Sequence, residues 1–126
     1  MHVIGPNRVA YLDYTGSGNE TARHAREGGP ITVMVMSMGA EDAAIVRLFG
    51  HATVTSVDES PLADILLSAT ADNIELPVRQ AVDVTVERTQ TSCGYGVPVF
   101  EFVSQRVRSE RGRRFKPKVS AVRPAR

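Results

Sequence analysis

The stretch at residues 78–89, VRQAVDVTVERT, has the clearest periodicity in the chain and decides the fold class. Val82, Val84 and Val86 alternate with Asp83, Thr85 and Glu87, so apolar and polar side chains project from opposite faces. This pattern is typical of a strand with one buried face and one face in water. It predicts an antiparallel sheet.

Three further stretches predict strands, because they are rich in β-branched and aromatic residues: Arg8–Tyr14, residues 31–38 and residues 43–57. Residues 31–38 form a continuous apolar run, so we expect both faces of that strand to be buried. Gly50 interrupts the longest strand and indicates a bulge or a barrel corner. No regular long helices separate the strands. The chain therefore predicts a mainly β (α+β) fold, an antiparallel barrel or meander with short helices.

The first expected helix follows the turn TGSGNET. Ser17 stands three residues before Glu20, which is the capping-box spacing, and Asn19 is a competing N-cap. The helix should run to about Arg26, because glycines favour a helix end and proline cannot continue the hydrogen-bond ladder at residues 28–30, GGP.

A second helix is expected to open at Ser60-Pro61, with Ser60 as N-cap. Its apolar face would carry Leu62, Ile65, Leu66 and Ala69. Residues 73–77 break this helix. Residues 91–98, TSCGYGVP, are expected to form a tight loop, and residues 99–108 form either a strand or a helix.

Composition places the chain among ordinary folded domains. It has 126 residues, of which 42% are hydrophobic and 23% charged. Its one cysteine excludes an internal disulfide framework and a multi-cysteine zinc site. No apolar run is long enough to span a bilayer, and the N-terminus lacks the layout of a signal peptide. We therefore expect a soluble, cytoplasmic protein.

The net charge of +1 conceals a strongly basic tail. Residues 106–126 contain nine Arg or Lys and one acidic residue, Glu110. We expect a domain at residues 1–105 and a flexible tail at 106–126. A frayed terminus and an arm that binds nucleic acid or a membrane surface both remain open. Phe115 is the tail's only aromatic residue, so no base-stacking platform is visible, which argues against nucleic-acid binding.

The best local candidate for a binding site is the loop at residues 15–21, TGSGNET, between a strand and a helix. Backbone N–H groups at a helix N-terminus are unpaired and attract anions. Gly16 and Gly18 would let a ligand approach the backbone, and Ser17, Asn19 and Thr21 add polar side chains. The loop could hold a phosphate. The same sequence also suits a plain turn, and Glu20 would place a negative charge beside the anion.

Arg47 lies between Val46 and Leu48 on an expected strand. It is either an outward-facing surface arginine or an inward one that pairs with a carboxylate or a ligand phosphate. Cys93 is interpreted as structural, because no histidine stands at a catalytic spacing from it. No metal-ligand pattern is present, and no side chain can be assigned as a catalytic acid or base.

Three segments resemble the pyridoxamine 5′-phosphate oxidase-related, FMN-binding split-barrel family. They are VAYLDYTGSGNETARHAREGGPITVMVM (9–36), IVRLFGHATV (45–54) and VDVTVERTQTSCGYGVPVFEFV (82–103), in the same order as in the family. The most telling pieces are LDYTGSGNET and QTSCGYGVP. The resemblance covers roughly residues 7–103.

The resemblance implies a six-stranded antiparallel split barrel, a homodimer, and an FMN at each side of the dimer interface. It implies a flavin-dependent oxidoreductase with an unassigned small-molecule substrate. The cofactor-binding candidates are Asp13, Thr15, Gly16, Ser17, Gly18, Asn19, Glu20, Thr21 and Arg47. The deazaflavin F420 could replace FMN in the same fold. A non-catalytic module that binds flavin, F420 or haem, or a degenerate barrel, is the alternative.

The chain departs from the family in two ways. The biosynthetic oxidase carries an Arg-Lys pair in the loop where this chain has Asn19, Glu20 and Thr21, which argues against pyridoxal phosphate synthesis. Family members also have about two more strands before the stretch that begins here. We therefore expect a barrel that lacks its first strands, with exposed sheet edges.

Overall fold

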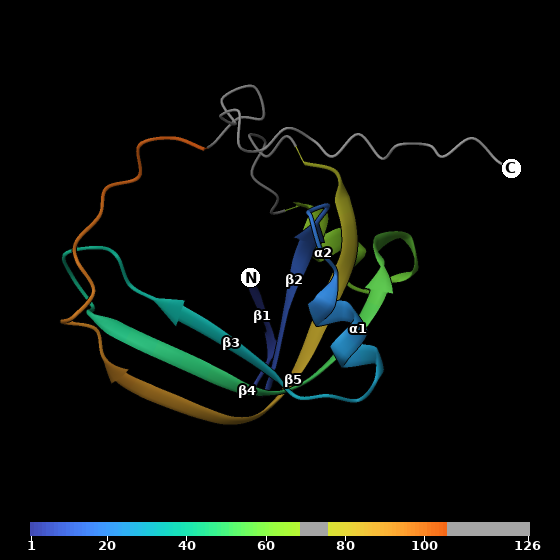
Figure 1. Ribbon diagram of the computed structural model, residues 1–126, viewed down its shortest axis with the longest axis horizontal. Coiled ribbons are helices and arrows are strands. Elements are labelled where there is room, and N and C mark those ends of the chain that lie inside the picture. The colour runs from blue at the N-terminus through green and yellow to red at the C-terminus, as the bar shows by residue number, and fades with distance from the viewer. Residues whose placement is uncertain (69–75, 106–126) are drawn as a thin grey trace, which may run out of the picture.

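The computed structural model describes residues 1–68 and 76–105, which form one antiparallel sheet with short helices (Figure 1). The strands are hydrogen-bonded in the order β1-β2-β5-β4-β3. Their bounds, in chain order, are β1 (His2–Gly5), β2 (Arg8–Tyr14), β3 (Ile31–Met36), β4 (Ala44–Ser56) and β5 (Val78–Cys93). The helices are α1 (Glu20–Arg26), the 3₁₀ helix η1 (Val57–Glu59) and α2 (Ala63–Ser68).

This sheet confirms the mainly β, antiparallel expectation but is not a meander. The last strand, β5, lies in the middle of the sheet between β2 and β4. The described part of the chain supplies five strands, not six, and does not show closure into a barrel. The strand β1 was not predicted, because HVIG is too short for its alternation to stand out.

β4 and β5 are the two longest strands of the sheet, pair with each other along most of their length and curve strongly (Figure 1). Their register shifts between Phe49 and Gly50, which confirms the predicted bulge. β5 continues to Cys93, because Ala44 of β4 still lies opposite that residue. The tight loop expected at residues 91–98 was therefore placed three residues too early.

Two apolar clusters lie on opposite faces of the sheet. On one face, Val82 and Val84 pack with Val9, which confirms that the alternating valines of β5 share a buried face. On the other face, Leu62 and Leu66 cover Ala10 and Ala81.

The helix α2 confirms part of the second helix prediction. Ser60 Oγ accepts a hydrogen bond from the Leu62 backbone N–H at 3.2 Å, as expected of an N-cap. Leu62 and Leu66 are buried, but Ile65 is half exposed, so the apolar face is narrower than the sequence suggested. Ala69 lies outside the described residues, and so does most of the break expected at 73–77.

The expectation of two buried faces was wrong for β3. This strand ends at Met36 rather than Met38, and it pairs only with β4 at the margin of the sheet. Met34 and Val35, which project from opposite faces, are 50% and 44% exposed. An apolar run indicates that a strand could be buried on both sides, but only its neighbours decide whether it is.

The helix α1 ends as predicted but begins differently. Gly28 has a φ of 81°, a left-handed conformation that suits glycine at a helix end. The N-cap is Asn19, and its side chain makes no capping hydrogen bond. The capping box between Ser17 and Glu20 was wrong, because the Glu20 carboxylate instead accepts from Arg23 Nη2 at 3.3 Å.

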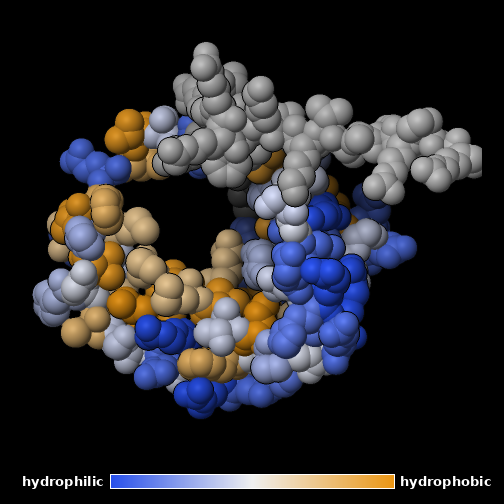
Figure 2. All heavy atoms as spheres, viewed as in Figure 1, coloured by the Kyte–Doolittle hydropathy of each residue, from blue (hydrophilic) through white to orange (hydrophobic). Residues whose placement is uncertain are grey.

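Residues 99–105 form neither the strand nor the helix that was expected, and several of their side chains are exposed. Residues 106–108 of that prediction lie outside the described residues, as does the basic tail. Figure 2 shows a hollow in this view of the molecule, bordered by mostly apolar residues in the region of β3, β4 and β5. No helix in the described ranges is long and apolar enough to cross a membrane.

Candidate functional site

The loop between β2 and α1 is held against the start of β5. The Thr15 backbone N–H donates to the Pro77 carbonyl at 2.9 Å. Three residues on, Arg79 Nη1 donates to the Gly18 carbonyl at 3.0 Å. The loop is therefore anchored at Thr15 and at its middle residue, Gly18, by residues more than 60 positions away in the chain.

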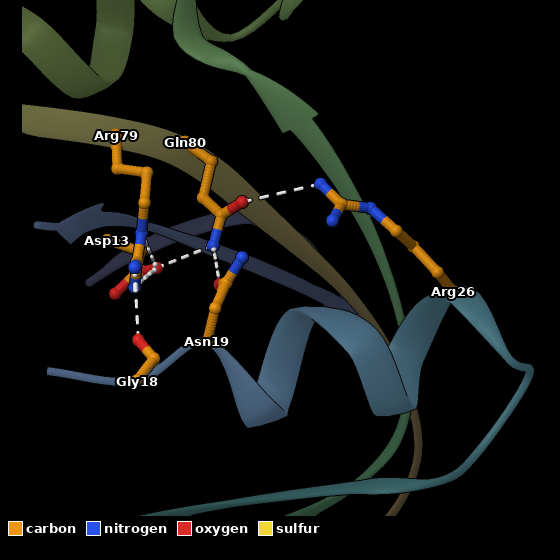
Figure 3. Close-up of polar contacts among 6 residues, drawn as sticks. All are labelled: Asp13, Gly18, Asn19, Arg26, Arg79 and Gln80. Atoms are coloured by element: carbon orange, nitrogen blue, oxygen red, sulfur yellow. Dashed lines mark hydrogen bonds and ion pairs between the residues drawn. The ribbon is translucent and has the colours of Figure 1, made fainter. Parts of the chain in front are cut away.

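The Asp13 carboxylate is the centre of this arrangement (Figure 3). Its Oδ2 atom accepts from Arg79 Nη2 at 2.8 Å and from Arg79 Nε at 3.2 Å. The same atom accepts from Gln80 Nε2 at 2.6 Å. Asp13 thus joins the end of β2 to the start of β5. Of the cofactor-binding candidates, it is the one that lies beneath the loop, bonded to Arg79 and Gln80.

The Gln80 side chain extends the network to both ends of α1. Gln80 is 4% exposed, and its Nε2 also donates to Asn19 Oδ1 at 2.7 Å. Its Oε1 accepts from Arg26 Nη2 at 3.4 Å. Because Asn19 is turned toward Gln80, it does not cap the first turn of α1. The helix start therefore carries no side-chain cap.

The outer side of the loop faces solvent. Thr15, Gly16, Ser17, Glu20 and Thr21 are all exposed, whereas Gly18 and Asn19 are partly buried. The structure thus brings eight of the nine cofactor-binding candidates together at one corner, with two exposed hydroxyl-bearing residues, Ser17 and Thr21, among them.

The two carboxylates next to the loop are each paired with an arginine. Asp13 is paired with Arg79, and Glu20 is paired with Arg23. The Glu20–Arg23 pair is largely exposed, and the Glu20 carboxylate lies beside Gly18 of the loop. Beside Asp13 on β2, burial raises the pKa of the Tyr11 phenol, and the Asp13 carboxylate raises it further, so Tyr11 stays neutral near pH 7.

The ninth candidate, Arg47, lies away from the loop. Leu48, Ala52 and Val54 of β4 pack against the Val9 cluster, so Arg47 projects from the other face. Asp13 projects from the same face as Tyr11, which packs on that cluster. Arg47 Nη1 donates to Ser92 Oγ at 3.4 Å, about 40 Å along β5 from Gln80 at the usual strand rise.

The remaining reactive side chains of residues 1–68 and 76–105 do not form a second centre. His24 Nε2 contacts the Pro30 carbonyl at 3.0 Å, and His51 Nδ1 contacts Glu87 Oε1. Cys93 is exposed at the end of β5. Within the described ranges, no group of three or more His, Cys, Asp or Glu side chains could hold a metal ion.

Sequence reasoning missed Arg79 and Gln80, which it treated only as strand residues. Their signal was weak: two long polar side chains in succession, just before the valine alternation begins. The register of β5 against β2 shifts between Asp13 and Tyr14. This irregularity accompanies the arrangement in which both side chains reach Asp13, although neighbours in a regular strand point to opposite faces.

Comparison with known proteins supplies one similarity. The chain is 35% identical over 99 residues to the "Pyridoxamine 5'-phosphate oxidase family protein ustO" of Aspergillus flavus. The match covers 79% of this chain and 39% of the relative, so the chain spans well under half of that protein's length. No family model matches the chain, and no solved structure matches it.

Proposed function

Because this chain belongs to the pyridoxamine 5′-phosphate oxidase family, we propose that it binds FMN and acts as a flavin-dependent oxidoreductase. When bound, the flavin supplies the redox chemistry, and the protein supplies binding and orientation. The observation that carries the proposal is the coincidence of this similarity with a shaped, exposed loop at residues 15–21.

The residues of the loop fit the phosphate of FMN. Ser17 and Thr21 present hydroxyl groups to solvent, and the first turn of α1 has no side-chain cap. Phosphate oxygens accept hydrogen bonds from such groups. Asp13 is paired with Arg79, which lowers the electrostatic cost of placing an anion there, and the exposed Glu20 side chain would have to turn away from Gly18.

A homodimer is part of the same proposal. Several apolar side chains after β5 are exposed, including Phe100 at 58% and Phe102 at 75%. Surfaces of this kind are typical of protein interfaces. A dimer would also account for Arg47: since it lies on the opposite face of its own chain from Asp13, it could join the loop's ligand only from the other copy.

The first prediction is that the protein, incubated with FMN and freed of excess, shows a flavin absorbance spectrum that bleaches reversibly with a reductant. Light scattering should give the mass of a dimer. A parallel incubation with F420 tests the deazaflavin alternative. A colourless protein that takes up neither compound would contradict the proposal, and binding without turnover of any electron donor or acceptor would favour the non-catalytic alternative.

The second prediction concerns the two hydroxyl groups. The double variant Ser17→Ala with Thr21→Ala should weaken FMN binding by about 1–3 kcal/mol, because each hydroxyl would lose a hydrogen bond to phosphate. Fluorescence titration measures the dissociation constant. The matched control is Thr53→Ala with Thr85→Ala, two exposed hydroxyl residues on β4 and β5 outside the loop. Equal affinity in all three proteins would show that the loop does not contact the phosphate.

A further inference from the structure

The two margins of the sheet differ in how open they are to a further strand. β1 has four residues, and its register with β2 shifts between Val3 and Gly5. Short and irregular edge strands resist pairing with another chain. β3, at the other margin, has six residues and an unbroken register with β4 (Figure 1). Its sequence, ITVMVM, contains no charged residue, proline or glycine, so β3 lacks the sequence features that protect an edge strand.

The backbone of β3 turns a row of polar groups toward its outer side. The Ser37 N–H donates to the Ala44 carbonyl at 3.0 Å, directly after β3 and in the same register. Residues of an antiparallel strand alternate between bonding the neighbouring strand and pointing away from it. The odd-numbered residues of β3 therefore bond to β4, as Ser37 does. The residues whose N–H and C=O groups point outward are Thr32, Met34 and Met36. Among the strands that the structure describes, none but β4 pairs with β3.

The side chains along this edge are apolar and partly exposed on both faces of the sheet. Met34 is 50% exposed on one face, and Val35 is 44% exposed on the other. Just beyond β3, the Phe100 N–H donates to the Met38 carbonyl at 2.9 Å. The exposed apolar residues at 99–103 therefore begin beside the end of this edge. One partner could cover both, which makes the edge continuous with the apolar surface of the proposed homodimer.

We propose that β3 is the centre of the homodimer contact: it pairs antiparallel with β3 of a second copy, about a two-fold axis at Met34. This inference rests on the homodimer of the proposed function and not on flavin binding. In this register Met34 faces Met34, and Thr32 faces Met36 of the other copy. Each outward N–H and C=O group then has a partner, because outward residues face outward residues. The same surface serves both copies, as a two-fold contact requires.

The side chains of a second copy also suit this edge. In the register centred on Met34, Val33 of one copy lies opposite Val35 of the other on one face of the sheet, and the two Met34 side chains meet on the other face. No charge loses its hydration in the strand pair, because β3 has no charged residue. The two five-stranded sheets would join into one continuous sheet.

The test measures the dissociation constant of the dimer by sedimentation of the full chain over a series of concentrations. Met34→Pro should raise this constant about tenfold or more, because the hydrogen bonds at the two-fold axis are lost. The substitution suits the monomer, since proline is tolerated on an edge strand where the N–H faces outward. Met34→Lys places two like charges opposite each other at the axis and is the second variant if Met34→Pro does not fold.

The matched control is Ile65→Lys. Ile65 of α2 is 50% exposed, as Met34 is, and it lies outside the proposed contact. This variant introduces the same charge in place of an equally exposed apolar side chain. It should leave the dissociation constant of the dimer unchanged.

Disulfide formation between copies checks the register itself. In a Cys93→Ser background, which removes the natural cysteine, Met34→Cys should link two copies under mild oxidation, because facing residues have Cα atoms about 5.5 Å apart. Thr32→Cys should not link them, since the two copies of residue 32 would be about 13 Å or more apart along the strands.

A dimer whose dissociation constant is the same in the wild type, Met34→Pro and Met34→Lys would overturn the inference and leave the homodimer to another surface. Equal disulfide yields at positions 34 and 32 would overturn the register. A chain that stays monomeric at every concentration would overturn the homodimer of the proposed function together with the inference. Uptake of FMN is measured separately and does not depend on any of these results.

Discussion

Replacing Gly50 by valine is expected to destabilise the protein by about 3 kcal/mol or more. A Cβ atom at Gly50 would lie 1.9 Å from the Thr85 carbonyl oxygen and 3.1 Å from the Val86 Cα. Both neighbours are backbone atoms of the central strand β5, so neither can rotate away. The β4–β5 ladder would have to separate at the bulge.

The measurement is urea unfolding followed by circular dichroism. The control is Gly39→Val, because a Cβ at Gly39 would meet no atom within 4 Å, and its φ is not in the left-handed region. That variant should change the unfolding free energy by less than about 1 kcal/mol. Similar stability of the two variants would show that β4 and β5 do not approach as closely as the structure indicates.

The second large effect is expected at Leu66 of α2. Leu66→Ala should lower the unfolding free energy by about 2–5 kcal/mol, because it removes a side chain that is 1% exposed from the cluster with Ala10 and Ala81. Ala10 and Ala81 are too small to fill the space, and the larger neighbours Leu62, Ile4, Leu12 and Val57 would have to shift to do so. The cavity would lie between α2 and the sheet, so the contact of α2 with Ala10 and Ala81 would be weakened.

The neighbouring Leu67 provides the control, since the same truncation there changes a side chain that is 44% exposed. Leu67→Ala should cost less than about 1 kcal/mol. The two unfolding curves should differ in midpoint and share one slope, as expected when only stability changes. Equal midpoints would contradict the packing of α2 on β2 and β5.

Local patterns were enough for the elements near the site. The alternation of β5 and the helix end at the glycines 28 and 29 depend on a few neighbouring residues, so they could be located from the chain. The capping of α1 could not, because Asn19 had a competing partner in Gln80, which lies 61 positions away. A choice between a local and a distant hydrogen bond depends on the tertiary fold.

The placement of the candidate residues divides in the same way. Thr15 to Thr21 are contiguous, so any compact turn keeps them together, and the sequence was sufficient to group them. Arg47 was grouped with them on chemistry alone. Its distance from the loop follows from the register of β4 against β5. That register cannot be predicted from Arg47 and its neighbours in the sequence.

By itself, then, the sequence determined that the chain makes antiparallel strands, where most of them lie, and that a glycine-rich turn precedes a short helix. These features follow from side-chain periodicity and backbone preferences over a few residues. Only the tertiary structure decided that β5 is central, that β3 is exposed, and that Arg79 and Gln80 support the loop. Those outcomes depend on which strands pair and in which register, a balance of contacts between residues far apart in the chain.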